Sequence, residues 1–89
     1  MKGNICFERV RLGRALQKPP ITQEQLANKI QLLGMDMTPI MISRIEKNER
    51  RVSDAELRIL SKALKVTMEW LVGDTDQLEP LKTKENSKG

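Results

Sequence analysis

Residues 38–51 hold the side chains of this chain that are best suited to chemistry, and that chemistry is the binding of an anion. Ile42 and Ile45 share one face of a short helix that the spacing predicts, and basic residues lie off that face or just after the helix. The four basic residues are Arg44, Lys47, Arg50 and Arg51. A helix with an apolar back and a cationic front is suited to lie against a polyanion, of which nucleic acid is the most regular.

Catalysis and metal binding find little support in the composition. The chain has no histidine and one cysteine, Cys6, which excludes a disulfide framework within the monomer and a Cys/His zinc site. Cys6 stands among apolar neighbours, so we interpret it as a small core residue. There is no glycine-rich phosphate loop or metal-ligand cluster, and Asp74 and Asp76 are too sparse for a calcium loop. We therefore expect no enzyme activity, no metal and no cofactor.

The length of 89 residues fits a single small domain. We assign residues 1–73 to this domain and residues 74–89 to a polar C-terminal tail, in which Leu78 and Leu81 are the only apolar anchors. No apolar run approaches the length of a membrane span, and the N-terminus lacks an apolar signal region. We therefore expect a cytoplasmic protein that does not associate with a membrane.

The elements that position the basic residues are marked by their starts. Four times, an apolar residue precedes a Ser or Thr cap and another apolar residue follows the cap by four, which is the hydrophobic staple. The four runs are Ile21-Thr22 with Leu26, Met37-Thr38 with Ile42, Val52-Ser53 with Leu57, and Val66-Thr67 with Leu71. The predicted helices span roughly 5–17, 23–33, 39–47, 54–65 and 68–72. No alternating β-branched run predicts a strand, so the fold class is all-α.

Helical spacing also predicts how the first two helices face the core. The first is expected to turn Val10 and Leu16 inward, with Gly13 between them allowing another helix to approach closely. The second is expected to turn Leu33 inward and to end at Gly34.

Several segments resemble, in order, the Cro- and phage-repressor-like (XRE family) helix-turn-helix regulators. They are TQEQLA, MISRIEKNER, VSDAEL and ALKVTMEWLVG, and the resemblance covers about residues 5–73. It implies a five-helix, lambda-repressor-like DNA-binding domain whose second and third helices form the helix-turn-helix. The third, residues 39–47, is then the recognition helix that enters the major groove of double-stranded DNA.

The resemblance further implies which residues meet DNA. The groove-facing, base-contacting positions are matched by Thr38, Pro39, Ile40, Ser43 and Arg44. The expected phosphate contacts are Arg14, Gln23, Lys47, Arg50 and Arg51. Arg44 is the best candidate to bind guanine O6 and N7, whereas Pro39 and Ile40 can only touch thymine methyl groups. For Glu46, a structural salt bridge is expected in preference to a base contact.

The function that follows from the resemblance is that of a bacterial or phage transcriptional regulator, with a repressor expected, that binds DNA as a homodimer. Residues expected to pack at the subunit contact or in the core are Met68, Trp70 and Leu71. An alternative stays open at this stage. The chain can instead be a protein-binding helical module or an antitoxin-like partner protein, with methionines 35, 37 and 41 and Ile40 lining a partner groove. The connection at residues 33–37 is longer than the usual turn of about three to four residues.

Overall fold

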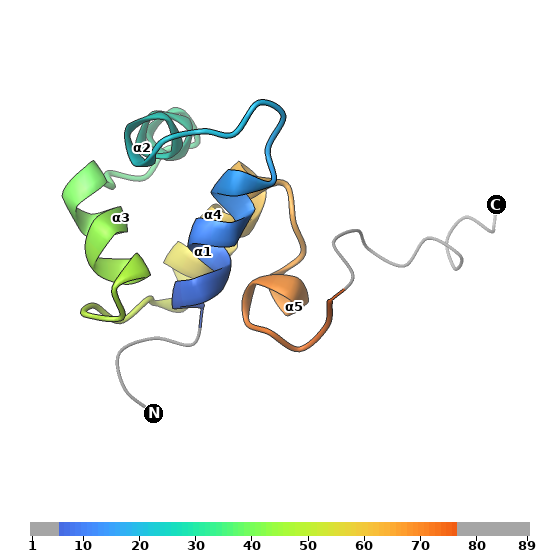
Figure 1. The fold of residues 1–89 in the computed structure, drawn as a ribbon. Helices are drawn as coiled ribbons and strands as arrows, with labels where there is room; N and C mark the ends of the chain where they lie inside the picture. The colour runs from blue at the N-terminus through green and yellow to red at the C-terminus, as the bar shows by residue number, and fades with distance from the viewer. Residues whose placement is uncertain (1–5, 77–89) are drawn as a thin grey trace, which may run out of the picture.

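The computed structural model describes residues 6–76, and all the regular structure in that range is helical. The elements are α1 (Phe7–Ala15), α2 (Gln23–Leu32), α3 (Pro39–Glu46), α4 (Asp54–Leu64) and α5 (Met68–Leu71). In Figure 1, α1 crosses in front of α4, α2 lies above them, α3 forms the left edge and α5 lies at the lower right. The prediction of a five-helix, lambda-repressor-like fold is confirmed.

All four predicted caps are formed, and each fixes where its helix begins. In each case the side-chain oxygen of the cap residue accepts a hydrogen bond from the backbone N–H three residues later. The cap residues of α2 to α5 are Thr22, Thr38, Ser53 and Thr67. Thr22 and Ser53 also complete the two predicted capping boxes, with Gln25 and Glu56. The first helix differs, because its N-cap residue Cys6 makes no side-chain cap hydrogen bond.

The ends of α2 to α5 are equally regular. Each passes through a residue in the left-handed conformation, with φ between 59° and 103°, at Gly34, Asn48, Lys65 and Gly73. At the first of these, the Gly34 N–H donates to Gln31 O at 3.0 Å and the Met35 N–H donates to Ile30 O at 3.3 Å. The same pair of bonds recurs at the other three ends, so each is a Schellman motif. The sequence does not predict Lys65 at such a position, because the left-handed conformation is costly for a residue with a Cβ atom.

The core is built from apolar residues of all five helices and the connection before α3. Its fully or nearly fully buried members are Cys6, Val10, Leu26, Ala27, Ile30, Met37, Ile42, Ile45, Leu60, Ala63, Leu64, Trp70 and Leu71. Gly13 lets α1 lie against α4, because a Cβ atom there would come within 3.1 Å of Leu64, so the predicted close approach is confirmed. Burial raises the pKa of the Cys6 thiol to about 11, which keeps it protonated and unreactive.

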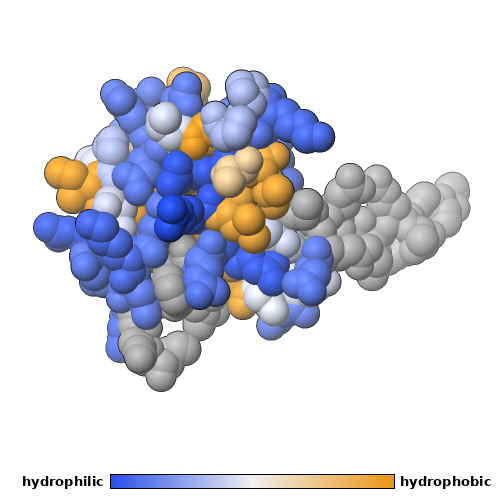
Figure 2. All heavy atoms as spheres, in the orientation of Figure 1, coloured by the Kyte–Doolittle hydropathy of each residue, from blue (hydrophilic) through white to orange (hydrophobic). Residues whose placement is uncertain are grey.

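Two leucines that helical spacing placed inward lie at the surface. The exposed fractions of Leu16 and Leu33 are 44% and 46%. Leu16 follows α1 with helical φ and ψ, and its N–H donates to Leu12 O at 3.0 Å, so it continues the face of α1 on which Leu12 is also 45% exposed. The Leu33 N–H likewise donates to Lys29 O at 3.2 Å, and Leu33 lies beside the exposed Leu32 at the end of α2. An apolar patch lies over the C-terminal part of α1 in Figure 2, where Leu16 and Leu12 are exposed.

The predicted tail, residues 74–89, is described only as far as Asp76, and Leu78 and Leu81 lie outside the described residues. Arg9 of α1 donates to Thr75 O at 3.1 Å and forms an ion pair with Asp76 at 2.9 Å. No helix within residues 6–76 has the length and apolar character needed to cross a membrane.

Candidate nucleic-acid interface

The helix α3 has an apolar back buried in the core and an exposed front. Ile42 and Ile45 have no exposed surface, and the staple residue Met37 before the cap is equally buried. On the front, Ile40 is 65% exposed and Arg44 is exposed one turn later. Because α3 forms one edge of the molecule in Figure 1, this front is open to a large ligand.

The first turn of α3 carries most of the side chains that are expected to contact bases. Thr38 is exposed, and its hydroxyl accepts a hydrogen bond from the Met41 backbone N–H at 3.2 Å, which leaves the hydroxyl hydrogen available for a ligand. Pro39 and Ser43 are half-buried. Four of the five residues expected to contact bases thus lie on α3 and Thr38 is its N-cap, with Thr38, Ile40 and Arg44 the exposed ones among them. Figure 2 shows a small apolar patch over the start of α3, where Ile40 is exposed.

The connection before α3 is fixed by its own contacts. The side-chain amide of Gln31 donates to Met37 O at 3.0 Å and so spans the connection. Met37 is fully buried, and Met35 and Met41 are partly buried against the core. The alternative in which these methionines line a partner groove is thus wrong for Met37, because its side chain fills the core.

A buried ion pair joins α1 to the end of α3. Arg14 donates to Glu46 twice, from Nε at 2.7 Å and from Nη2 at 2.9 Å. The side chains are only 17% and 6% exposed, so the salt bridge expected for Glu46 is confirmed. Arg14 also donates to Ile21 O at 3.0 Å, in the segment that leads into α2. Bonds of this kind are directional and charge-assisted, so they fix the angle between the two helices.

Gln23 belongs to the same network. Its Nε2 atom donates to Glu46 Oε1 at 2.9 Å, which ties the first residue of α2 to the last residue of α3. An amide nitrogen carries two hydrogens, so one N–H of Gln23 is left to meet an anion beside the start of α2. The helix start adds backbone N–H groups, which favour an anion at the same place.

A second ion pair holds the loop that follows α3. Arg50 donates to both carboxylate oxygens of Glu56 at 2.9 Å, and one of its nitrogens also donates to Arg51 O at 3.0 Å. The same carboxylate accepts the Ser53 backbone N–H at 3.1 Å, so it closes the loop and caps α4 at once. The hydrogen bonds from Arg50 are the main reason that the pKa of Glu56 lies below its usual value.

Three cations of the interface remain without such a partner. Arg44, Lys47 and Arg51 are exposed, and none of them forms an ion pair within residues 6–76. In Figure 2 a hydrophilic surface covers the lower part of α3 and the loop after it, where these residues lie. Of the expected phosphate contacts, Lys47 and Arg51 thus form no ion pair in the part of the chain that the structure describes, whereas Arg14 and Arg50 bind the carboxylates of Glu46 and Glu56.

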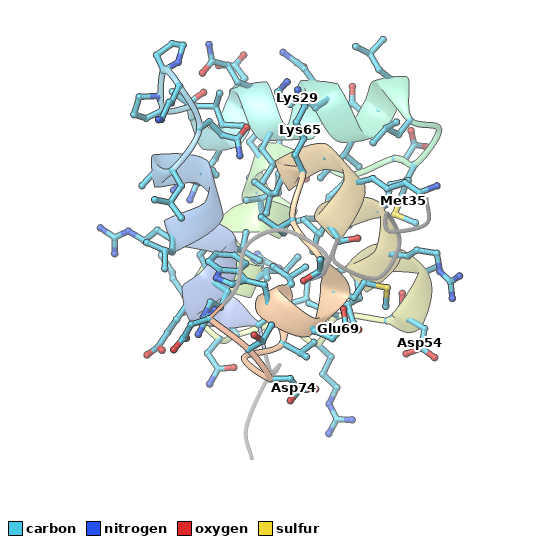
Figure 3. The ribbon with its side chains drawn as sticks, turned by 90° about the vertical axis from the view of Figure 1, so that its right-hand side faces the viewer. Lys29, Met35, Asp54, Lys65, Glu69 and Asp74 are labelled. Atoms are coloured by element: carbon cyan, nitrogen blue, oxygen red, sulfur yellow. The ribbon has the colours of Figure 1, made fainter. Side chains whose placement is uncertain are left out.

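The residues expected at a subunit contact lie away from α3. Trp70 is 3% exposed and Leu71 is fully buried, so both belong to the core of the domain. Met68 is half-buried and lines a groove between α4 and α5, which Glu69 and Asp74 border. Figure 3 shows these two acidic residues beside α5 on the side of the molecule turned toward the viewer.

Sequence reasoning missed the polar side chains that span distant elements. Gln31 crosses the connection before α3. Gln17, two residues after α1, donates to Gly13 O at 3.0 Å and to Leu64 O at 2.9 Å, and so joins the end of α1 to the end of α4. Arg9 joins α1 to α5. A glutamine or arginine on a helix gives no sign in the sequence of which distant carbonyl it will reach. Within the described residues, no group of acidic or cysteine side chains is arranged to hold a metal ion.

Comparison with protein-family models matches residues 14–71 to the family described as Helix-turn-helix. The match spans more than half of the chain and includes α2, α3 and the connection between them. Neither a curated protein nor a solved structure matches the chain.

Proposed function

This chain belongs to the Cro- and phage-repressor-like (XRE) helix-turn-helix family of DNA-binding regulators, and we propose that it is a sequence-specific transcriptional repressor. It reads the major groove of double-stranded DNA with α3. The observation that carries the proposal is the exposed front of α3, where Ile40 and Arg44 stand over a back that is fully buried. A recognition helix presents its N-terminal residues to base edges in this manner.

The expected contacts to DNA divide into those to base edges, which give sequence specificity, and those to phosphates, which give affinity. Specificity comes from Arg44, with Ser43 and Ile40, because only contacts to base edges distinguish sequences. Affinity comes from Arg51 and Lys47, whose charged groups are free to meet phosphates, and from the remaining N–H of Gln23. Arg14 and Arg50 support the interface from behind, because their guanidinium groups already bind Glu46 and Glu56.

The protein binds its site as a homodimer. A pseudo-palindromic site places two recognition helices about 34–36 Å apart, so the subunit contact must lie away from α3. Met68 and the groove between α4 and α5 offer such a surface, and Trp70 and Leu71 support it from the core. Met68→Asp is expected to dissociate the dimer without unfolding the protein. The molar mass measured by light scattering should then fall from that of a dimer toward that of a monomer.

The test of the function is selection of bound duplexes from a random pool, followed by titration of Arg44→Ala and Arg51→Ala on the selected and on scrambled duplexes. Arg44→Ala should relax the preference for the selected sequence, since it removes a base contact worth about 1–3 kcal/mol of discrimination. Arg51→Ala should weaken binding to both duplexes alike and lower the salt slope by about one. Equal losses for both variants on every duplex would contradict this division.

The remaining alternative is a protein-binding module or an antitoxin-like partner that does not read DNA. Binding to any duplex at low salt separates the two, because phosphate-led binding is strongest there and weakens steeply as salt rises. If no duplex from the pool binds at low salt, the DNA-binding proposal fails and the module remains.

A further inference from the structure

We propose that the exposed side of α4 is a second phosphate-binding surface, with which a molecule held on one duplex by α3 captures a second duplex. The surface consists of Arg58, Lys62 and Lys65, here called the α4 basic row. Its ligand is the sugar–phosphate backbone of double-stranded DNA, bound without regard to sequence. None of these residues takes part in the proposed contacts of α3 with DNA.

The first observation is the alignment of the three cations. Arg58, Lys62 and Lys65 follow one another by four and three residues, so they share one side of the helix over about 10 Å, and all three are exposed. Like charges at this spacing destabilise a helix slightly. The helix dipole favours Lys62 in the last turn, but it gives no such benefit to Arg58 in the middle of α4. The stability of α4 therefore does not account for the row.

The second observation is that carboxylates do not neutralise the row. Glu56 of α4 is bound to Arg50 in the loop before it. Asp54 lies one turn before Arg58, yet the two form no ion pair. Within residues 6–76 no ion pair includes a member of the row, so its three charges are available to an external anion.

The third observation is the place of the row in the fold. Figure 3 shows Lys65 together with Lys29 of α2 at one end of the side turned toward the viewer, and Glu69 and Asp74 at the other end. Because α2 packs against α4, Lys29 extends the positive surface beyond the row. The helix α3 forms the left edge of Figure 1, whereas Figure 3 is seen from the right, so these lysines face away from α3. A duplex bound by α3 therefore leaves them open.

The chemistry of the row favours nucleic acid over a protein partner. The other exposed residues of α4 are Asp54 and Ala55, so no aromatic or large apolar side chain stands among the cations. The buried centre of a protein interface needs such side chains, whereas binding to phosphates needs only cations. The row also does not line the groove between α4 and α5, so the proposed subunit contact does not require it.

The experiment uses the full chain and two duplexes. The tightest duplex recovered from the random pool is immobilised and saturated with protein, and a fluorescent duplex of scrambled sequence is then added at increasing salt. The proteins are the wild type, the double variant Arg58→Gln with Lys62→Gln, and the control Arg11→Glu. Arg11 is exposed on α1, and both variants lower the formal net charge of +4 by two. Circular dichroism checks that each variant is folded.

We expect the wild type and Arg11→Glu to retain the second duplex at low salt. The double variant should bind the first duplex as the wild type does, but it should retain less of the second, with a salt slope smaller by about two. A second duplex that carries the selected site should be retained no better than the scrambled one, because phosphates carry no sequence information.

Three results would overturn the second surface while the first duplex stays bound and the proposed function stands. The first is a wild type that retains no second duplex, which would leave an acidic protein as the partner of the row. The second is an equal loss in Arg11→Glu, which would trace retention to net charge alone. The third is a preference for the selected site, which would mean that another copy of α3 holds the second duplex. A wild type that binds no duplex at all would contradict both proposals.

Discussion

The guanidinium group of Arg9 lies over the indole ring of Trp70, with its Cζ atom 4.7 Å from the ring centroid. Arg9 also donates to Trp70 O and to Thr75 O, both at 3.1 Å. A cation on the face of an indole is attracted by the ring quadrupole, and the two hydrogen bonds are charge-assisted. One side chain of α1 thus fixes both the ring and the backbone of α5.

Replacing Arg9 by alanine should lower the free energy of unfolding by about 2 kcal/mol, because the ring contact and the charge-assisted bonds are lost together. Trp70 is the only tryptophan, so its fluorescence reports on this place during urea unfolding. Asp76→Asn is the control. Its carboxylate is 98% exposed in the ion pair with Arg9, so its loss should change stability by well under about 1 kcal/mol. Equal losses in the two variants would mean that the ion pair, and not the ring, holds Arg9.

Breaking the ion pair between Arg14 and Glu46 from one side should be costly. Glu46→Gln should lower the free energy of unfolding by roughly 3 kcal/mol, because Arg14 is then a buried charge without its counter-charge. Arg14→Met should lower the free energy of unfolding by a similar amount, because Glu46 is then a buried carboxylate without its cation. Urea unfolding at neutral pH measures both.

The double variant Arg14→Met with Glu46→Leu is the informative comparison. Apolar residues of similar volume can replace a buried ion pair at little cost, so the double variant should be more stable than either single one. It should nevertheless bind DNA less well than the wild type, because Gln23 loses the acceptor that orients it. A double variant with the summed loss of the single ones would refute the coupling between the two residues.

The ion pair of Glu56 with Arg50 should make stability depend on pH in the acid range. The pKa of Glu56 is lowered in the folded state from 4.5, so the stability that it provides is present above that value and is lost as pH falls through the folded pKa. Glu56→Gln keeps the capping box but removes the charge. It should be about 1–2 kcal/mol less stable than the wild type at pH 7 and equally stable at about pH 2. A constant gap across this range would show that Glu56 acts through its shape and not its charge.

Lys65 offers a route to a more stable domain. Its φ of 59° at the end of α4 costs a residue with a Cβ atom about 1–2 kcal/mol, whereas glycine adopts this conformation freely and loses about 0.5–1 kcal/mol of chain entropy. Lys65→Gly should therefore raise the free energy of unfolding by about 0.5–1 kcal/mol, seen as a higher Tm. Lys65→Ala removes the same charge without relieving the backbone, and it should not raise Tm. Figure 3 shows that Lys65 lies on the side of the molecule that bears α5.

The helices of this fold could be predicted because their signals are local. Thr22 and Ser53 lie within a few residues of the groups they cap, and Gly34 and Gly73 mark ends that depend only on the backbone nearby. The misplaced Leu16 shows where such reasoning stops. Its spacing and backbone are helical, but it lies one turn after Leu12 on a face of α1 that stays exposed, and tertiary packing decides which face of a helix is covered.

The exposed residues of the candidate site could be predicted from the sequence, but the ion pairs that hold them in place could not. The exposed front of α3 follows from the alternation of Ile42 and Ile45 with basic residues. The engagement of Arg14 and Arg50 does not, since the sequence around an arginine does not show whether it contacts a phosphate or a carboxylate of its own chain. Only the packing of α1, α3 and α4 decides which of the two it is.

Because Cys6 makes no side-chain cap hydrogen bond, α1 lacks the local stabilisation that the other four helices have at their N-termini. The N–H groups of its first turn gain no side-chain acceptor from the cap residue. The helix is held instead by the burial of Val10 in the core and by hydrogen bonds to distant elements, from Arg9 and Arg14 within it and from Gln17 just after it. Amide hydrogen exchange in α1 should therefore rise as soon as any of its neighbours opens, whereas α2 and α4 retain their own local ends. The protection of α1 is thus a measure of whether the whole domain is assembled, and it can be followed one amide at a time.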